Sequence, residues 1–425
     1  MAKKIFSEID KQIFILSFGN ALLLMGYGMS IPFMSIYLHV ERGLPAGVVG
    51  AIVAFATLLT SLASGLSGEL SDVFGRKKLM NLSLLCRSAS MFLIAGAMAM
   101  NAHHAWVILF HFLGSFFGAF FRPSSNAWIA DHTTPRERIK AFGYIRIGIN
   151  IGWAAGPAVG GILAGTSFAM AFAFTGFAYL VTSAMLHIKI SDSFVKNKER
   201  KTKFIDMVKE LKKNPLLAKV CFLILLIALV SAQLVTGLSL HGIKYIKLTQ
   251  AQIGLLFSVN GIVIVALQYF VSKVMTDMRI TTAMIIGCVI YGIGYMTVGF
   301  AGAFWFAAAG VAMAAIGEMA LSPGANTLMS NIAPSHLRGR YLGLQEVSRQ
   351  SGAAIGMLMA GLMIDHLSPI KPYIPWIIIG FVAFAAAYGF YKIRKYFTPE
   401  QDGINQCPIQ PIPQTPSDDV QVSAK

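Results

Sequence analysis

Residues 46–66 read AGVVGAIVAFATLLTSLASGL, and residues 68–78 just after them read GELSDVFGRKK. The first stretch contains no charged residue, and a helix of about 20 such residues crosses a hydrocarbon layer roughly 30 Å thick. The second stretch gathers acidic residues, two glycines and three consecutive bases in a short polar turn. Together they predict a membrane-spanning helix that ends in a charged loop.

Apolar runs of this length recur along the whole chain. Of its 425 residues 56% are hydrophobic and 13% are charged, and the mean hydropathy of +0.64 does not suit a surface that faces water. Because unpaired backbone groups are costly in lipid, each run is expected to form a helix rather than a strand. We therefore predict an all-α membrane protein with twelve transmembrane helices, at residues 12–38, 45–67, 78–100, 104–130, 140–165, 167–189, 215–240, 250–275, 281–300, 304–330, 341–365 and 372–394.

The net charge of +16 is unevenly distributed. With twelve spans, almost all Lys and Arg residues flank one side of the membrane, and the positive-inside rule makes this the cytoplasmic side. The excess charge therefore reflects orientation, and no nucleic-acid partner is expected. We expect a multi-pass cell-membrane protein with both termini in the cytoplasm. Its four cysteines show no metal-ligand spacing, so neither a metal site nor a cofactor is predicted.

A polar segment after the sixth span divides the chain into two halves. We predict six-helix bundles at residues 1–189 and 215–396, joined by a cytoplasmic linker at 190–214. Within the linker, residues 204–213 form either a short amphipathic helix on the membrane surface or part of a solvated charged segment. The tail, 397–425, is rich in proline and polar residues and is expected to be disordered.

The two halves share a sequence repeat at an offset of 200 residues. The shared segment begins near the end of the fourth span of each half and continues through the fifth. Because both copies begin on the same side of the membrane, the repeat is parallel. Seven identities coincide in one ungapped register, namely Pro123 and Pro323, Asn126 and Asn326, Arg138 and Arg338, Gly143 and Gly343, Gly152 and Gly352, Gly156 and Gly356, and Gly161 and Gly361.

The polar turn at 68–78 fits the loop signature G-x-L-[SA]-D-x-x-G-R-[KR] between the second and third spans of the major facilitator superfamily. The chain resembles that superfamily over residues 10–395. A second stretch, GINIGWAAGPAVGG at 148–161, is similar to the fifth-helix pattern of its drug:proton antiporter branch. The resemblance implies two parallel, pseudo-symmetric six-helix bundles that work by alternating access, with a central cavity near the bilayer midplane.

The resemblance also implies a gate in the loop at 68–78. Asp72 is expected to meet the N-terminal end of the eleventh helix, where a carboxylate is stabilised by about 0.3–2 kcal/mol, when the cytoplasmic side closes. Arg76 is expected to bridge Asp72 and Asp131. The alternative is that the bases only set the orientation of the chain. The residues assigned to this gate are Gly68, Asp72, Gly75, Arg76, Lys77 and Asp131.

Small residues recur every four positions along the fifth helix. Such a stripe lets another helix approach closely, and Pro157 removes a backbone N–H within it. The resemblance implies that the stripe packs on the eighth helix, about which the halves rock; the alternative is packing without a role in gating. The residues concerned are Gly148, Gly152, Gly156, Pro157, Gly160 and Gly161.

Glu318 lies in the middle of the tenth span with no base nearby in sequence. An isolated carboxyl group at that depth is expected to hold a proton, and we predict that it couples transport to protons, with Arg122 as its partner. Glu346 and Arg349 can pair at i and i+3, with a lesser role in the cavity. His111 stands beside Phe110, where the superfamily places an arginine, and can titrate or simply pack.

No catalytic motif or phosphate-binding loop is present, so neither an enzyme nor an ATP-driven pump is predicted. We expect a monomeric secondary transporter in contact with membrane lipids, which exchanges protons for an exported hydrophobic or amphiphilic solute. The alternatives are a symporter or uniporter for a nutrient or metabolite, and a lipid or lysolipid flippase.

Overall fold

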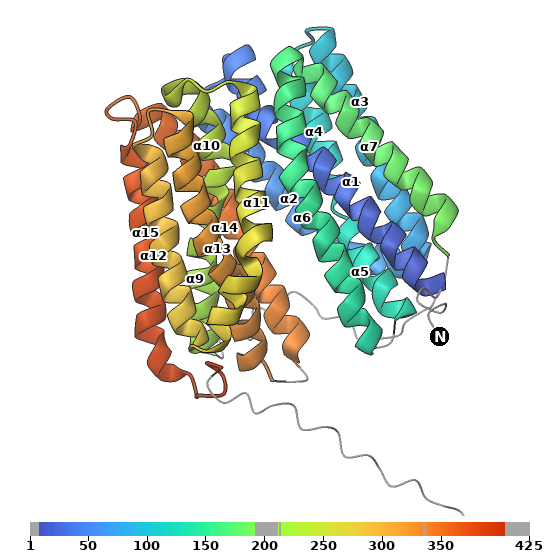
Figure 1. Ribbon diagram of the computed structural model, residues 1–425. Helices are drawn as coiled ribbons and strands as arrows, with labels where there is room; N and C mark the ends of the chain where they lie inside the picture. Colours follow the sequence, from blue (N-terminus) through green and yellow to red (C-terminus); the bar gives the residue numbers. More distant parts are fainter. Residues whose placement is uncertain (1–7, 134, 192–210, 212–213, 335–336, 404–425) are drawn as a thin grey trace, which may run out of the picture.

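The computed structural model describes residues 8–133, 135–191, 211, 214–334 and 337–403, and these ranges contain helices and turns but no strand. The helices form two bundles that stand side by side (Figure 1). The prediction of an all-α membrane protein in two bundles is confirmed.

The N-terminal half consists of α1 (Glu8–Ile36), η1 (Tyr37–Glu41), α2 (Ala46–Phe74), α3 (Arg76–Ala99), α4 (His104–Gly118), α5 (Phe121–His132), α6 (Pro135–Thr166) and α7 (Phe168–Lys189). The C-terminal half consists of α9 (Pro215–Ser231), η2 (Ala232–Leu234), α10 (Thr236–His241), η3 (Gly242–Ile246), α11 (Gln250–Thr276), α12 (Ile280–Gly299), α13 (Phe304–Ile332), α14 (Arg338–His366), α15 (Ile374–Ile393) and η5 (Arg394–Tyr396).

Two predicted spans are interrupted. The fourth breaks between α4 and α5, at Ala119 and Phe120, and the seventh changes from α9 through η2 to α10. Pro123 lacks the N–H that would bond to the carbonyl of Ala119, which is where the first break lies. Eleven of the described helical segments are long and apolar enough to cross a membrane. The remaining predicted span corresponds to α14, which is 29 residues long but whose first half carries Gln345, Glu346, Arg349 and Gln350.

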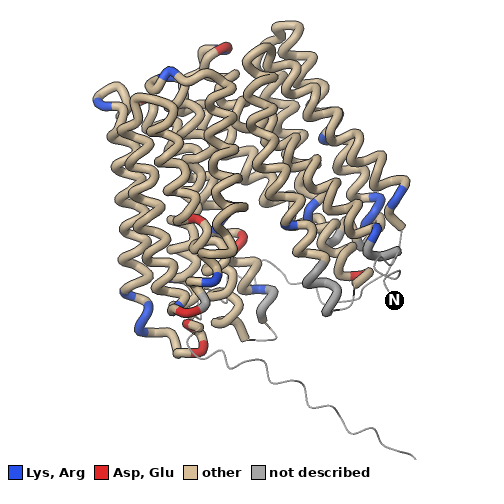
Figure 2. The backbone as a smooth tube through the Cα atoms, viewed as in Figure 1, with Lys and Arg blue, Asp and Glu red and all other residues tan. Residues whose placement is uncertain are grey.

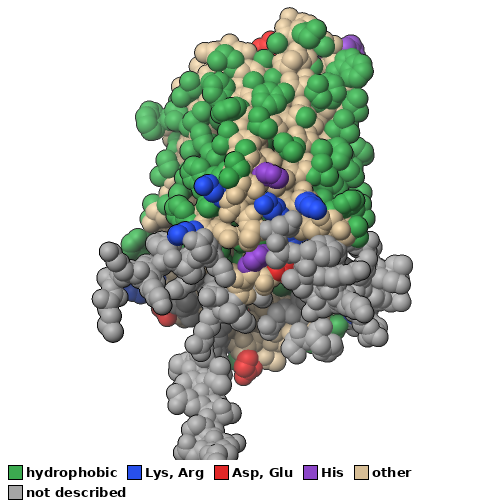
Figure 3. Space-filling view, turned by 90° about the vertical axis from the view of Figure 1, so that its right-hand side faces the viewer, with side chains coloured by type: hydrophobic (Ala, Val, Ile, Leu, Met, Phe, Trp, Pro, Cys, Tyr) green, Lys and Arg blue, Asp and Glu red, His purple; other side chains and the backbone are tan. Residues whose placement is uncertain are grey.

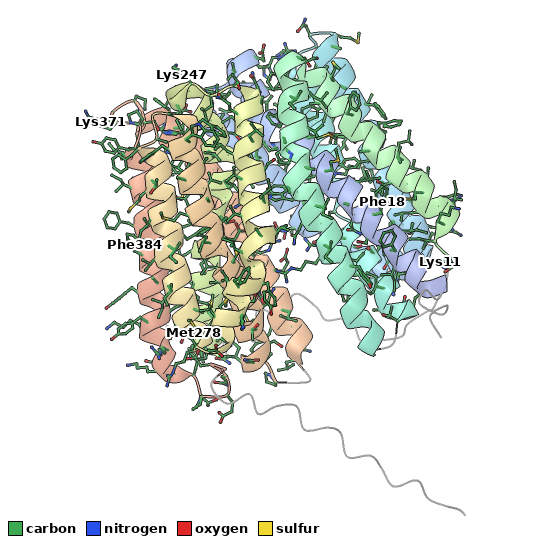
Figure 4. The ribbon with its side chains drawn as sticks, viewed as in Figure 1. Lys11, Phe18, Lys247, Met278, Lys371 and Phe384 are labelled. Atoms are coloured by element: carbon green, nitrogen blue, oxygen red, sulfur yellow. The ribbon has the colours of Figure 1, made fainter. Side chains whose placement is uncertain are left out.

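The two halves meet mainly through two helix pairs, α6 with α11 and α2 with α14, and α1 makes a smaller contact with α10. The bundles lie close together at the top of Figure 1 and diverge toward the bottom. Lys247 and Lys371 mark the upper end, and Lys11 and Met278 mark the lower end (Figure 4). Most Lys and Arg residues gather toward the lower end (Figure 2). We call the upper end the closed end and the lower end the basic end.

The outer surface suits lipid. In the face shown by Figure 3, apolar side chains cover the upper part and basic side chains lie in a row beneath them. On α7, for example, Phe174, Phe177 and Ile188 are all at least half exposed. Continuous apolar surface of this kind is a liability in water but is the normal lipid contact of a membrane protein.

The first residues of the tail are ordered, contrary to the prediction of disorder from residue 397. Asp402 accepts hydrogen bonds from the backbone N–H of Thr281, at 2.8 Å, and from its hydroxyl group, at 2.7 Å. Its backbone carbonyl accepts from the N–H of Ile280 at 3.0 Å. Asp402 therefore caps the first turn of α12, because a carboxylate satisfies N–H groups that have no partner within the helix. The rest of the tail, residues 404–425, and the predicted amphipathic segment, except Leu211, lie outside the described residues.

Candidate transport site between the two halves

Charged side chains from both halves face each other within the membrane-spanning region. On α14, Arg349 donates to both carboxylate oxygens of Glu346, from Nε at 2.8 Å and from Nη2 at 2.5 Å. Gln350 donates to the same carboxylate at 2.9 Å. The predicted pairing of Glu346 with Arg349 is therefore present. The side chain of Glu346 is 54% exposed and that of Arg349 is 46% exposed, so both border open space rather than a packed core.

Arg122, on α5, faces this pair from the N-terminal half. Its side chain is exposed, and it makes no hydrogen bond or ion pair with any described residue. It interacts electrostatically with Glu346 across the space, as Tyr27 of α1 does with Arg349. We call the region bordered by Tyr27, Arg122, Glu346 and Arg349 the central opening.

Arg87, on α3, extends behind the central opening. Its guanidinium lies 5.6 Å from the ring centre of Tyr27 and 4.9 Å from that of Tyr179, and cation–π attraction at such distances stabilises it. Its buried Nε has no hydrogen-bond partner among the described residues. Gly118 makes this placement possible, since a methyl group there would overlap the Arg87 side chain. Sequence reasoning assigned no role to Arg87 or Tyr27, because neither belongs to a motif.

Glu318 lies inside the C-terminal half, on α13, and the predicted partnership with Arg122 is wrong. The carboxylate of Glu318 accepts a hydrogen bond from the amide of Asn260, on α11, at 3.4 Å. The nearby phenol groups of Tyr291 and Tyr295 also interact with it electrostatically. Arg122 instead interacts electrostatically with Glu346. Within the described part of the chain no cation pairs with Glu318.

The sequence repeat explains why the two halves differ at this level. Gly118 and Glu318 are 200 residues apart, the offset of the repeat. In the N-terminal half the glycine leaves room for a cation from α3, whereas in the C-terminal half the same position supplies a carboxyl group itself. One pseudo-symmetric position thus makes room for a half-buried base in one half and supplies a half-buried acid in the other.

His111, on α4, does not border the central opening. It is only 3% exposed, and neither ring nitrogen has a hydrogen-bond partner. It lies within the electrostatic field of Arg87. Of the two readings of this residue, packing inside the N-terminal bundle accounts for its burial.

The loop at 68–78 holds one of the predicted contacts. Nε of Arg76 lies 3.2 Å from Oδ2 of Asp131, which ties α3 to α5, and the guanidinium also donates to the hydroxyl of Ser71. Gly75 adopts φ 89°, a conformation that favours glycine, in the one-residue turn between α2 and α3. Lys77 is half-buried at the start of α3. The surroundings of Gly68 and the side chain of Asp72 are not described by the structure, so contact between Asp72 and the eleventh helix stays a prediction.

The predicted contact of α6 with the eighth helix, α11, is present, but the stripe of Gly148, Gly152, Gly156 and Gly160 packs on α1 instead, which corrects the neighbour predicted for these glycines. A methyl group on Gly148, Gly152 or Gly156 would overlap backbone atoms of α1, namely the carbonyl oxygens of Ser17, Ala21 and Met25 respectively, and one on Gly160 would overlap Met29. Four-residue spacing fixes one helix face but does not identify the neighbour.

The adjacent face of α6 makes the contact with α11. Methyl groups added to Gly161 or Gly254 would overlap carbonyl oxygens across this interface, those of Gln250 and Pro157. Ser258 of α11 donates to the carbonyl of Ala154 at 2.7 Å. Pro157 and Gly161 therefore belong to the interface between halves, and the other glycines belong to the N-terminal half.

The same arrangement repeats in α14. Methyl groups on Gly352 and Gly356 would overlap carbonyl oxygens of α9, and one on Gly361 would overlap that of Ala46 in α2.

A family model described as the Major Facilitator Superfamily matches residues 16–353 and 243–413. The chain belongs to the Major Facilitator Superfamily.

Curated relatives within this superfamily include proteins named for drug resistance. Multidrug resistance protein 2 of Bacillus subtilis (strain 168) is 28% identical over 400 residues, which cover 89% of this chain and 94% of that protein. Quinolone resistance protein NorA of Staphylococcus aureus (strain N315) is 30% identical over 183 residues, 42% of this chain and 46% of that protein. The chain is thus similar to a drug-resistance protein over nearly its whole length.

Solved Major Facilitator Superfamily structures share the fold at low sequence identity. A POT family transporter in complex with 5-aminolevulinic acid has a TM-score of 0.76 at 14% identity, covering 92% of this chain and 96% of that one. The nucleoside transporter NupG has a TM-score of 0.77 at 14% identity, covering 91% of this chain and 99% of that one. This likeness concerns the arrangement of helices alone.

The C-terminal half of this superfamily member also carries an apolar groove on its surface, of about 260 Å³. It lies between α11, α12 and α13. Its lining residues are Phe270, Val271, Val274, Met275, Met278, Ala283, Gly287, Ile290, Ile316 and Ala320. None of these side chains is polar, so the groove suits an acyl chain and offers nothing that would recognise a headgroup.

Proposed function

We propose that this transporter exports hydrophobic or amphiphilic solutes in exchange for protons. The proposal rests on one observation: the carboxyl group of Glu318, within the C-terminal bundle, is hydrogen-bonded to the neutral amide of Asn260. A carboxylate without a cationic partner is costly inside a membrane protein, whereas its protonated form is not. Gain and loss of a proton therefore change the electrostatics of this half substantially. The drug-resistance name of the Bacillus subtilis relative supports a solute of this class.

The orientation follows from charge. Lys and Arg gather at the basic end (Figure 2), and the positive-inside rule places such an end in the cytoplasm. The termini then lie in the cytoplasm of a cell-membrane protein, and the conformation described here opens inward. Solute enters the central opening from the cytoplasm or the inner leaflet, and the halves then rock so that the closed end separates.

Closure of the basic end is assigned to the loop at 68–78. The ion pair of Arg76 with Asp131 holds α3 and α5 together, so these helices move as one body. Asp72 then reaches the N-terminal turn of α14, where a carboxylate is favoured by the helix dipole and by free N–H groups. This contact forms only when the basic end is shut.

Proton-coupled export is tested with the full chain in proteoliposomes. The wild-type protein is expected to move a lipophilic dye such as Hoechst 33342 against a gradient when a pH difference is imposed. Glu318→Gln removes the titratable group while keeping the size of the side chain. We expect it to lose pH-driven accumulation and to retain dye binding, because the glutamine mimics only the protonated state.

Glu41→Gln is the matched control, since Glu41 is an exposed acid outside the bundle interior. It should transport as the wild type does. Unchanged pH-driven transport in Glu318→Gln, with an unchanged thermal unfolding temperature, would contradict the proposal. Protons that move in the same direction as the solute on its addition would identify symport instead.

A further inference from the structure

We infer that the central opening binds the anionic group of an aromatic solute, with Arg122 as the residue that receives it. This inference rests on the proposed transport function and narrows its substrate class. Three features support it: the positive charge of the opening, the second arginine beside it, and the row of aromatic rings that adjoins both.

The charge balance of the opening is positive. Glu346 is the acid that borders it, and its carboxylate is already engaged by Arg349 and Gln350. Arg122 is exposed and has no ion pair or hydrogen bond with the described residues. Glu346 and Arg349 form a pair without net charge, so Arg122 gives the described residues that border the opening a net positive charge. Guanidinium groups bind carboxylates in charge-assisted hydrogen bonds, which are stronger than those between neutral groups.

A second cation reinforces the first. Arg87 contacts Tyr27, which borders the opening, and its buried Nε has no hydrogen-bond partner in the part of the chain that the structure describes. Aromatic rings stabilise the Arg87 guanidinium but do not neutralise it, and no carboxylate of the described residues pairs with it. Buried charges within membranes are normally paired. An anion held by Arg122 would therefore be favoured by the field of Arg87 as well.

An aromatic surface joins these cations to the other half. The ring centres of Tyr27 and Trp153 are 6.0 Å apart, and those of Trp153 and Phe257 are 6.3 Å apart. The three rings belong to α1, α6 and α11, so this row crosses from the N-terminal half to the C-terminal half. Trp153 is only partly buried, which leaves ring surface for a planar solute. Because Tyr27 belongs both to this row and to the cationic group, one small molecule can contact both.

The test uses three probes with the same ring and different polar groups: 2-naphthoate, 2-naphthylmethanol and 2-naphthylmethylamine. Their dissociation constants are measured by isothermal titration calorimetry on the full chain in detergent. We expect the carboxylate to bind roughly ten- to a hundredfold more tightly than the alcohol, the range that corresponds to a hydrogen bond to a charged group. The ammonium compound should bind more weakly than the alcohol.

Arg122→Gln should remove the preference for the carboxylate and leave the alcohol unchanged, whereas Arg122→Lys should retain part of the preference. Arg279→Gln is the matched control, because Arg279 is an exposed arginine at the start of α12, away from the opening. It should behave as the wild type. Equal binding of all three probes, or equal weakening of all three by Arg122→Gln, would overturn the inference.

The binding test of the anionic site and the transport test of proton-coupled export can fail independently of each other. If a pH difference drives transport of the dye but the wild-type protein prefers the ammonium probe, export stands and the anionic substrate class fails. If the carboxylate preference depends on Arg122 but no pH-driven transport occurs, the binding site stands and proton-coupled export fails.

Discussion

Asp365 caps α2 across the boundary between the two halves. Its carboxylate, near the end of α14, accepts hydrogen bonds from the N–H of Ala46 at 3.0 Å and from the N–H of Gly47 at 2.6 Å. Both donors lie in the first turn of α2, where N–H groups have no partner within the helix and the helix dipole favours an anion. The interaction predicted for Asp72 against the eleventh helix thus exists in mirrored form, between the same two helices at the opposite end.

Loss of this cap should loosen the closed end. Replacement of a capping residue by alanine costs about 0.5–2 kcal/mol, so Asp365→Ala should shift the balance of conformations toward those in which the closed end is open. Asp365→Asn keeps an acceptor oxygen and should have a smaller effect. Spin labels at Glu41→Cys and Lys371→Cys, both exposed on the closed end in opposite halves, would report the distance between the halves. An identical distance distribution in all three proteins would contradict the capping role.

The glycines of α6 should separate into two functional classes. Gly156→Ala places a methyl group against the backbone of Met25, within one half, and overpacking of this kind costs about 1–3 kcal/mol. We expect a lower unfolding temperature. Gly161→Ala meets the backbone of α11 in the other half, so it should change the distance between the halves more than stability. Gly165→Ala is the control, since nothing lies within 4 Å of its added methyl group. A loss of stability in the control equal to that of Gly156→Ala would refute this division.

The pair of Arg76 and Asp131 should behave as a coupled unit. Both side chains are largely buried, with 10% and 14% of their surfaces exposed, so removal of one partner weakens the charge compensation of the other. Arg76→Gln or Asp131→Asn alone should destabilise the protein by several kcal/mol, up to about 3–5 kcal/mol for a fully buried pair. The double variant should be more stable than the sum of the two effects predicts. Strictly additive losses in thermal unfolding temperature would show that the two residues do not interact in solution.

The helices could be predicted because the length of an apolar run is a local property, but the site depends on contacts that sequence spacing does not determine. The sequence gives depth along a helix: Arg122 is four residues beyond Gly118, the counterpart of Glu318, so the two appeared to lie at similar levels. It does not give the face of the helix, and Arg122 faces Glu346 instead. Asp365 and Asn260 were missed because their roles depend on groups supplied by other helices, the first turn of α2 and the carboxyl group of Glu318.

The amide of Asn260 should set the pH range in which Glu318 releases its proton. Its N–H donates to the carboxylate and therefore favours the ionised form over the protonated form. Asn260→Leu replaces the amide with an apolar group of similar size, so the carboxyl group should hold its proton more tightly. Release into the cytoplasm then requires a higher internal pH, and the dependence of export rate on internal pH should move to higher values. Asn20→Leu is the control, because Asn20 is a buried amide whose one hydrogen bond among the described residues goes to the backbone of its own helix. Proteoliposomes loaded at a series of internal pH values would give both curves, and a curve for Asn260→Leu that moves to lower pH would contradict the role assigned to this amide.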